Sequence, residues 1–183
     1  ALAAEDRCHL SGLAMENGAP AYVTAHAATD SPGGWREKKA GGGVVVDVAT
    51  GEPLAGGFMM PHSPRLVNGE LWLLDSGQGV LLRVDTKTGA RTPIARLPGF
   101  ARGLCIAGDR ALVGLSKIRE SQVFGGLPIS LRHATLACGV AVVDTTSGAI
   151  EGLLRFTSGC DEIFDVGLLR GERRVQLVGP TAA

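Results

Sequence analysis

Two histidines at equivalent places in repeated segments of the chain are the residues best suited to chemistry. His9 and His62 each lie four residues before a leucine, Leu13 or Leu66, at the start of similar strand-like segments. Neutral imidazole ligates divalent metals and also titrates near neutral pH. The pair could therefore hold a divalent metal ion or contact a ligand directly, or the two rings could cap their strands by bonding backbone groups.

The same alignment, extended to Leu104 and Leu168, places Phe100 and Phe164 at the position of the histidines. Carboxylates that converge on histidines from different segments could complete a metal site or form an acid and base pair. The spacing alone is not a metal signature, so these residues are candidates for ligand binding first. The charged residues near this position are Arg65, Arg102, Glu162 and Asp165.

An insertion at residues 28–43, "ATDSPGGWREKKAGGG", interrupts the first repeated unit between its second and third strand-like segments. It is polar and rich in glycine, a composition typical of lids and binding loops. Trp35, Arg36 and Glu37 could stack on and hydrogen-bond a sugar or another planar polar ligand. The alternative is that the arginine and the glutamate pair with each other and hold the loop in place.

A second insertion, residues 116–139, interrupts the third unit at the equivalent place and carries one phenylalanine, Phe124. Lys117, Arg119 and Glu120 could supply contacts to an anion or a general acid, or could pair with one another. We expect both insertions to pack over the same mouth of the fold.

A hairpin phrase that occurs three times indicates the elements that must position these side chains. "GVVVDVATGEPLAGG" returns as "GVLLRVDTKTGARTPIARL" and "GVAVVDTTSGAIEGLLRF", each with an aspartate, a Thr or Ser three residues later and then a glycine. Such an aspartate accepts hydrogen bonds from the amides of its own turn, and the glycine can take a positive φ. We therefore interpret Asp47, Asp85 and Asp144 as turn residues and not as catalytic carboxylates.

The spacing of these aspartates predicts a β-propeller of four-stranded antiparallel blades. The 38 residues from Asp47 to Asp85 match one blade, and the 59 from Asp85 to Asp144 match a blade plus the second insertion. Apolar residues occupy both faces of the segment around Trp72, which favours strands packed on both sides by neighbouring blades.

About three and a half units are visible, because two strand-like phrases, "FDVGLLRG" and "RRVQLVG", follow the last hairpin. Three and a half blades do not close a ring, since an open edge would remain. We expect residues 1–183 to form a single β-propeller domain, the carboxy-terminal portion of a ring of six or seven blades.

Composition narrows the function classes. Eighteen basic residues balance eighteen acidic ones, so no overall field favours nucleic acid or an anionic membrane, and no apolar run approaches the roughly 20 residues of a membrane span. The chain has no GxSxG, GxGxxG or GxxxxGK[ST] motif. Cys8, Cys105, Cys138 and Cys160 lie far apart without a CxxC pair, and we expect free thiols in a cytoplasmic protein.

Several adjoining phrases carry a resemblance to a known family. They are "CHLSGLAMENGAPAYVTA", "TDSPGGWREKK", "MPHSPRLVNGELWLLDSGQG", "LPGFARGLCIAGDRALVGLSKIRE" and "EIFDVGLLRG". Together they resemble a bacterial family of conserved hypothetical proteins that carry a domain of unknown function and are taken to be β-propellers. The resemblance implies this fold and a longer amino end but no reaction, and this chain has Ser11 where the family phrase has Asn.

Two function classes remain. The first is a propeller that binds a small polar ligand or a partner protein at the mouth of its central channel, where polar residues of inner strands and loops gather. The second is a metal-dependent hydrolase similar to the propeller lactonases, with a divalent metal ion at His9 and His62. Lactonase-like sites are rich in Asn, Asp and Glu, whereas the aligned positions here are His, His, Phe and Phe, which favours binding.

Overall fold

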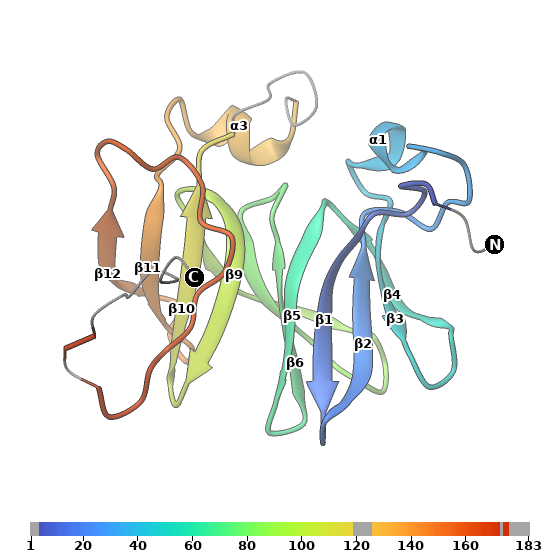
Figure 1. Ribbon diagram of the computed structural model, residues 1–183, viewed down its shortest axis with the longest axis horizontal. Helices are drawn as coiled ribbons and strands as arrows, with labels where there is room; N and C mark the ends of the chain where they lie inside the picture. The colour runs from blue at the N-terminus through green and yellow to red at the C-terminus, as the bar shows by residue number, and fades with distance from the viewer. Residues whose placement is uncertain (1–3, 119–125, 173, 176–183) are drawn as a thin grey trace, which may run out of the picture.

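Three four-stranded antiparallel sheets make up the computed structural model, which describes residues 4–118, 126–172 and 174–175 (Figure 1). Each sheet is a meander in which strands that follow one another along the chain are paired. The first sheet contains β1 (Leu10–Glu16), β2 (Ala19–Ala25), β3 (Gly43–Asp47) and β4 (Pro53–Phe58). The second contains β5 (Pro61–Val67), β6 (Glu70–Asp75), β7 (Val80–Val84) and β8 (Arg91–Arg96). The third contains β9 (Phe100–Ala107), β10 (Arg110–Ser116), β11 (Gly139–Asp144) and β12 (Ile150–Arg155).

The second sheet is buried between the other two. Leu71 and Leu73 on one face of β6 belong to an apolar cluster that contains Phe58 of the first sheet. Trp72 and Leu74 on the opposite face belong to a second cluster, formed with the third sheet. Successive side chains of a strand point to opposite faces, so one apolar run packs against both neighbours. The all-β class, the four-stranded sheets and the packing of strands on both faces are thus confirmed.

The predicted fourth unit does not form strands in the part of the chain that the structure describes. Residues 156–172 contain no strand, and most of the phrase "RRVQLVG" lies outside the described residues. The segment is held to the third sheet by isolated contacts: the Ser116 hydroxyl donates to the carbonyl oxygen of Ile163 (3.2 Å) and accepts the Ile163 N–H (2.9 Å). A side chain thus replaces the backbone ladder that a strand requires. Among the described residues, the three sheets do not close into a ring.

The described parts of both insertions lie at the same end of the sheets, where loops that cover one mouth would lie. The first contains the short helix α1 (Trp35–Lys38) and the second contains α3 (Pro128–Arg132), and Figure 1 shows both above the sheets. Trp35 of α1 and Ile129 of α3 belong to one buried cluster, together with Phe100 of β9. The insertions therefore add a small core of their own to this end of the molecule.

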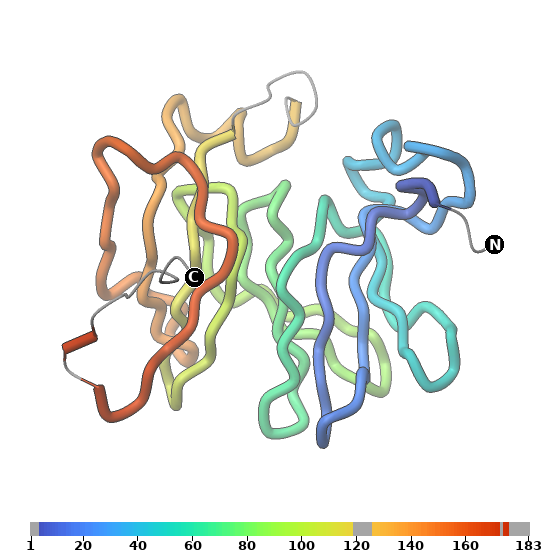
Figure 2. Tube along the Cα trace, viewed as in Figure 1, coloured from blue at the N-terminus to red at the C-terminus, as the bar shows by residue number. Residues whose placement is uncertain are grey.

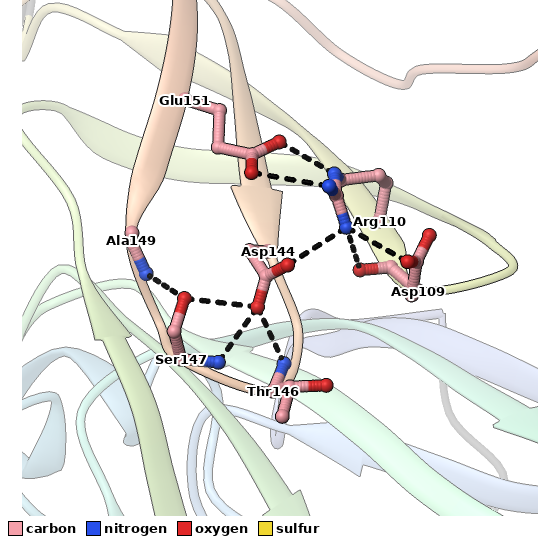
Figure 3. Close-up of polar contacts among 7 residues, drawn as sticks. All are labelled: Asp109, Arg110, Asp144, Thr146, Ser147, Ala149 and Glu151. Carbon is pink, nitrogen blue, oxygen red and sulfur yellow. Dashed lines mark hydrogen bonds and ion pairs between the residues drawn. The ribbon is translucent and has the colours of Figure 1, made fainter.

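The repeated aspartates are turn residues, which confirms the structural interpretation. Asp144 accepts hydrogen bonds through Oδ1 from the N–H groups of Thr146 (3.0 Å) and Ser147 (2.7 Å), as Figure 3 shows. Asp47 and Asp85 accept equivalent bonds from the two amides that follow in their turns. These bonds satisfy amides that have no partner in the strand ladder.

Two substitutions of Asp144 should distinguish the stability contribution of the turn hydrogen bonds from that of the ion pair with Arg110. Asp144→Ala loses the turn bonds and the ion pair between Asp144 Oδ2 and Arg110 (2.7 Å), so we expect the Tm to fall by roughly 3 °C. Asp144→Asn keeps the oxygen that accepts both amides and should lose less than half as much. Scanning calorimetry of the two variants measures the difference, and an equal loss in both would assign the effect to the ion pair instead.

Candidate functional site

A cavity of about 230 Å³ lies where the first strands of the three sheets meet the carboxy-terminal segment. The strands β1, β5 and β9 contact one another in this order, and Figure 2 shows residues 161–168 running across β9 and β10. Each of these elements contributes polar or aromatic side chains to the wall. They are Ser11 of β1, His62 and Arg65 of β5, Arg102 of β9, and Phe164 and Asp165 of the segment.

Irregular backbone in the inner strands shapes the cavity. The pairing of β5 with β6 breaks between His62 and Arg65, and Ser63 in this break has a φ of 52°. The Ser63 hydroxyl accepts the N–H of Gly103 (2.9 Å), which lies in the matching break of β9. A Cβ at Gly103 would lie 2.6 Å from the Cα of Asp165, so only glycine lets the segment approach this closely. Bulges of this kind often turn side chains toward a site.

His62 presents a neutral ring with one free acceptor. Its Nδ1 lies 3.0 Å from the carbonyl oxygen of Met60 and 2.9 Å from Ser76 Oγ. The Ser76 hydroxyl itself donates to the carbonyl oxygen of Ala101 (2.6 Å), so both neighbours of Nδ1 accept and Nδ1 carries the proton. Burial lowers the pKa of His62 to about 3, and the Arg102 guanidinium adds to this effect. Nε2 therefore remains as an acceptor at neutral pH.

The two arginines of the cavity have different roles. Arg65 is anchored: its Nε donates to the carbonyl oxygen of Leu104 (2.9 Å) and its Nη2 pairs with Asp165 (3.0 Å). Arg102 lies over the ring of Phe164, with 4.3 Å from Cζ to the ring centre. Within the described residues, its guanidinium has no hydrogen bond and no ion pair. Arg102 is therefore the cation of the cavity that can serve a ligand.

A stack of aromatic rings adjoins the cavity at His62. The ring of His26 lies between those of His9 (4.4 Å between centres) and His62 (5.0 Å), and Trp35 contacts both His9 (4.6 Å) and His26 (5.1 Å). Asp6 holds the outer end, because it lies 2.9 Å from His9 Nδ1 and accepts the Trp35 indole N–H (2.8 Å). Although partial burial opposes the effect, these hydrogen bonds lower the pKa of Asp6. The two predicted histidines are thus joined by a third.

The sequence reasoning missed His26, which is 1% exposed. Neither ring nitrogen has a hydrogen-bond partner among the described residues. Burial lowers the pKa of His26 to about 2, helped by His62, His9 and Arg102. A signal was present in the sequence, because His26 directly follows an apolar second strand, where a buried residue is expected.

The strand register corrects one part of the histidine alignment. In each sheet, the strand pairs connect one residue of the first strand, through the second strand, to the residue just before the turn aspartate. Leu13 and Leu66 occupy this place in the first two sheets, as predicted, but Ile106 and not Leu104 occupies it in the third. The counterpart of the two histidines is therefore Arg102, four residues before Ile106, and not Phe100. Phe100 instead pairs with Ser116 and is buried beneath the insertions.

Four predicted site residues, His62, Arg65, Arg102 and Asp165, are brought together in the cavity. His9 does not line it and contacts it only through the ring stack. Lys117 pairs with Asp161 (2.6 Å) at the base of the carboxy-terminal segment. Glu162 is exposed in the same segment, and its carbonyl oxygen accepts the Cys160 thiol. Arg119 and Glu120, like Phe124, lie outside the described residues.

The first insertion does not offer the open ring that we expected. Trp35 is 3% exposed, and its ring contacts the two histidine rings and Arg36, whose Cζ lies 4.7 Å from the indole centre. Stacking of Trp35 on a ligand is therefore wrong for this structure. Glu37 is exposed on α1, and no ion pair joins it to Arg36 in the described part of the chain.

The side chains do not fit a divalent metal centre at His9 and His62. Among the residues that the structure describes, no three His, Cys, Asp or Glu side chains are grouped to hold a metal ion. His9 does not line the cavity with His62, and the neighbouring guanidinium of Arg102 would repel a cation. The metal-dependent hydrolase therefore stays a prediction from the sequence without support from ligand geometry.

Comparison with known proteins gives a family and a fold. The family model described as "Domain of unknown function (DUF4915)" matches residues 1–178. The crystal structure of the computationally designed Ika4 protein is similar, with a TM-score of 0.50 and 15% identity over 88% of this chain and 81% of that chain. The designed Ika8 protein has a TM-score of 0.46 and 12% identity over 87% of this chain and 40% of its own.

The likeness to the Ika4 protein supports the all-β arrangement and, at 15% identity, shows the fold alone. No protein with a curated description matches the chain in sequence. No helix among the described residues is long and apolar enough to cross a membrane. The chemistry of the cavity must therefore be argued from its own side chains.

Proposed function

The chain belongs to the family of the domain of unknown function (DUF4915), and we propose that it binds a small polar ligand with one anionic group in the cavity between β1, β5 and β9. The observation that carries this proposal is Arg102. Its charge lies in the wall of a cavity, and no described residue pairs with it. A guanidinium is a strong donor to carboxylates and phosphates.

The other groups of the cavity select the rest of the ligand. His62 Nε2 accepts, because its pKa keeps the ring neutral, and the carboxylate of Asp165 also accepts. Acceptors in the wall favour a ligand with hydroxyl donors. The exposed ring of Phe164 offers an apolar face. A small hydroxycarboxylate fits this set best, and the volume of about 230 Å³ is below the roughly 300 to 1,000 Å³ of sites for drug-sized ligands.

We propose in addition that the three sheets are blades of a β-propeller. Support comes from the radial order of the strands, since the first strand of each sheet lies inside and the fourth lies outside. The cavity would then lie at the central channel, where propellers commonly bind ligands. The proposed ligand site does not depend on how many blades surround it.

Gluconate and sorbitol form a matched pair of probes for the site. They differ mainly in a carboxylate, so charge recognition by Arg102 should make gluconate bind at least tenfold more tightly than sorbitol in isothermal titration calorimetry. Arg102→Leu should remove this difference. Arg155→Leu, at the exposed end of β12, is the control and should bind gluconate as the natural chain does.

Two results would contradict the proposal. One is equal affinity for gluconate and sorbitol in the natural chain, together with no binding of inorganic phosphate. The other is a carboxylate preference that survives in Arg102→Leu. Circular dichroism of this variant checks that the sheets are intact, since Arg102 is only half-buried and its loss should leave the fold in place.

A further inference from the structure

Two cysteines that do not line the cavity contact each other. Cys138 directly precedes β11, and Cys160 lies at the beginning of the segment that forms one wall of the cavity. Their sulfur atoms are 3.8 Å apart. In the described part of the chain, Cys8 and Cys105 have no such contact with another thiol. The wide spacing of the four cysteines along the sequence predicted separate thiols, so this pair is a product of the fold.

Contacts on both sides hold the two sulfur atoms in place. The backbone N–H of Phe156 donates to the carbonyl oxygen of Cys138 (2.9 Å), which fixes the start of β11 against the end of β12. The residue after Cys160, Asp161, accepts the backbone N–H of Lys117 (2.9 Å) and pairs with its ammonium group (2.6 Å). The thiols therefore meet because two anchored backbones bring them together.

We infer that Cys138 and Cys160 are a redox modification site, at which a low-molecular-weight disulfide such as oxidised glutathione converts the two thiols into one internal disulfide. A disulfide needs a sulfur separation of about 2.05 Å. The sulfurs must approach by less than 2 Å from their present distance, about the gain that side-chain rotation and a small shift of the segment can supply. The product ties residues 160–168 covalently to the third sheet.

The reaction balances as two thiol–disulfide exchanges. The thiolate of half-exposed Cys160 attacks one sulfur of the small disulfide and releases one small thiol, which leaves a mixed disulfide on Cys160. The buried Cys138 thiolate then attacks the Cys160 sulfur and releases the second small thiol. Two protein thiols are oxidised, the small disulfide is reduced to two thiols, and their two protons come from the cysteines.

The surroundings of Cys138 slow its thiol–disulfide exchange at neutral pH. Burial raises the pKa of the Cys138 thiol to about 11, and the adjacent Cys160 and Asp161 act in the same direction, while the ammonium group of Lys117 opposes them. The thiolate is the attacking species, so the second exchange should be faster at pH 8.5 than at pH 7. Reduction by an excess of small thiol should reverse the reaction.

Oxidised glutathione added to the complete chain tests the inference by mass spectrometry. The expected product has lost two hydrogen atoms, retains no glutathione and yields a peptide in which Cys138 and Cys160 are joined. Cys138→Ser should stop at a glutathione adduct on Cys160, whereas Cys105→Ser, the control, should still form the internal bond. A stable adduct on Cys160 of the natural chain, or a bond that forms between other cysteines, would overturn the inference.

Proteolysis and ligand titration separate this site from the proposed function. The oxidised chain should be cleaved at Arg170 at least threefold more slowly than the reduced chain, because the bond restrains the segment in its opened states. This readout involves no ligand. A change in gluconate affinity on oxidation would rest on the proposed function as well, so a joined peptide with unchanged gluconate binding would leave the disulfide established and restrict its role to the segment.

Discussion

Lowering the pH from 6.5 to about 4.5 is expected to reduce the free energy of unfolding by about 4 to 5 kcal/mol, because two buried histidines take up protons when the chain unfolds. The folded chain holds the pKa of His26 at about 2 and that of His62 at about 3, whereas both are 6.5 in the unfolded chain. Stability from these groups is complete above pH 6.5 and is lost as the pH falls, since only the unfolded chain binds the protons. The slope approaches about 2.7 kcal/mol per pH unit.

Other titrating groups reduce the size and the pH range of this stability loss but do not reverse its sign. Burial raises the pKa of Asp75, although the Met59 N–H and the Gln78 amide donate to its carboxyl group. Asp75 therefore takes up a proton first in the folded chain and offsets part of the loss. The pKa of Asp6 is lowered, so its stabilising contribution is lost only below about pH 4. Urea unfolding at several pH values between 7.5 and 4.5 measures the slope.

His26→Phe is the matched control for the acid effect. Neither nitrogen of His26 has a partner among the described residues, so a phenyl ring removes the titrating group without breaking a hydrogen bond. We expect the slope to fall by half, to about 1.4 kcal/mol per pH unit. An unchanged slope in His26→Phe would mean that this ring is not held neutral by burial.

Much of the fold could be predicted from the sequence because it depends on interactions between residues that are close along the chain. The turn aspartates predicted three hairpins because an aspartate, its hydrogen-bonding amides and the glycine lie within five residues, as in Asp144 to Gly148. Alternation around Trp72 likewise predicted a strand buried on both faces. The phrase beginning at Phe164 is as apolar as these, yet it forms no strand, since pairing depends on a neighbour that a short phrase does not specify.

Less of the candidate site could be predicted from the sequence, because the site depends on the register of paired strands and on contacts between residues that are distant along the chain. The equivalence of His9 and His62 followed from spacing. In the third sheet the strand pairing aligns Ile106, two residues after Leu104, with Leu13 and Leu66, so Arg102 and not Phe100 occupies the third position. The pairing of Arg65 with Asp165 joins residues 100 positions apart. His26 was missed because one histidine after an apolar strand carries no signal of the two rings that flank it.

Trp35→Ala is expected to lower the free energy of unfolding by about 3 to 5 kcal/mol, the cost of removing a large buried aromatic side chain. The indole is 3% exposed, contacts His9 and His26, and donates its N–H to Asp6. Trp35→Phe keeps an aromatic ring in the cluster and loses mainly the hydrogen bond, so its loss should be about 1 to 2 kcal/mol. Urea unfolding at pH 7.5 compares the two variants, and equal losses would show that the hydrogen bond to Asp6, not the packing, holds α1.

The same substitution should also weaken the acid effect, which connects the insertion to the buried histidine. Once the indole is absent, water reaches His26, and the pKa of this ring rises toward 6.5 because its burial was the main cause of the low value. The folded variant then takes up a proton that the natural chain excludes. We therefore expect the stability difference between Trp35→Ala and the natural chain to shrink by at least 1 kcal/mol from pH 7.5 to pH 5. A constant difference would show that the sheets alone shield His26 from water. The first insertion would then have no part in keeping His26 neutral.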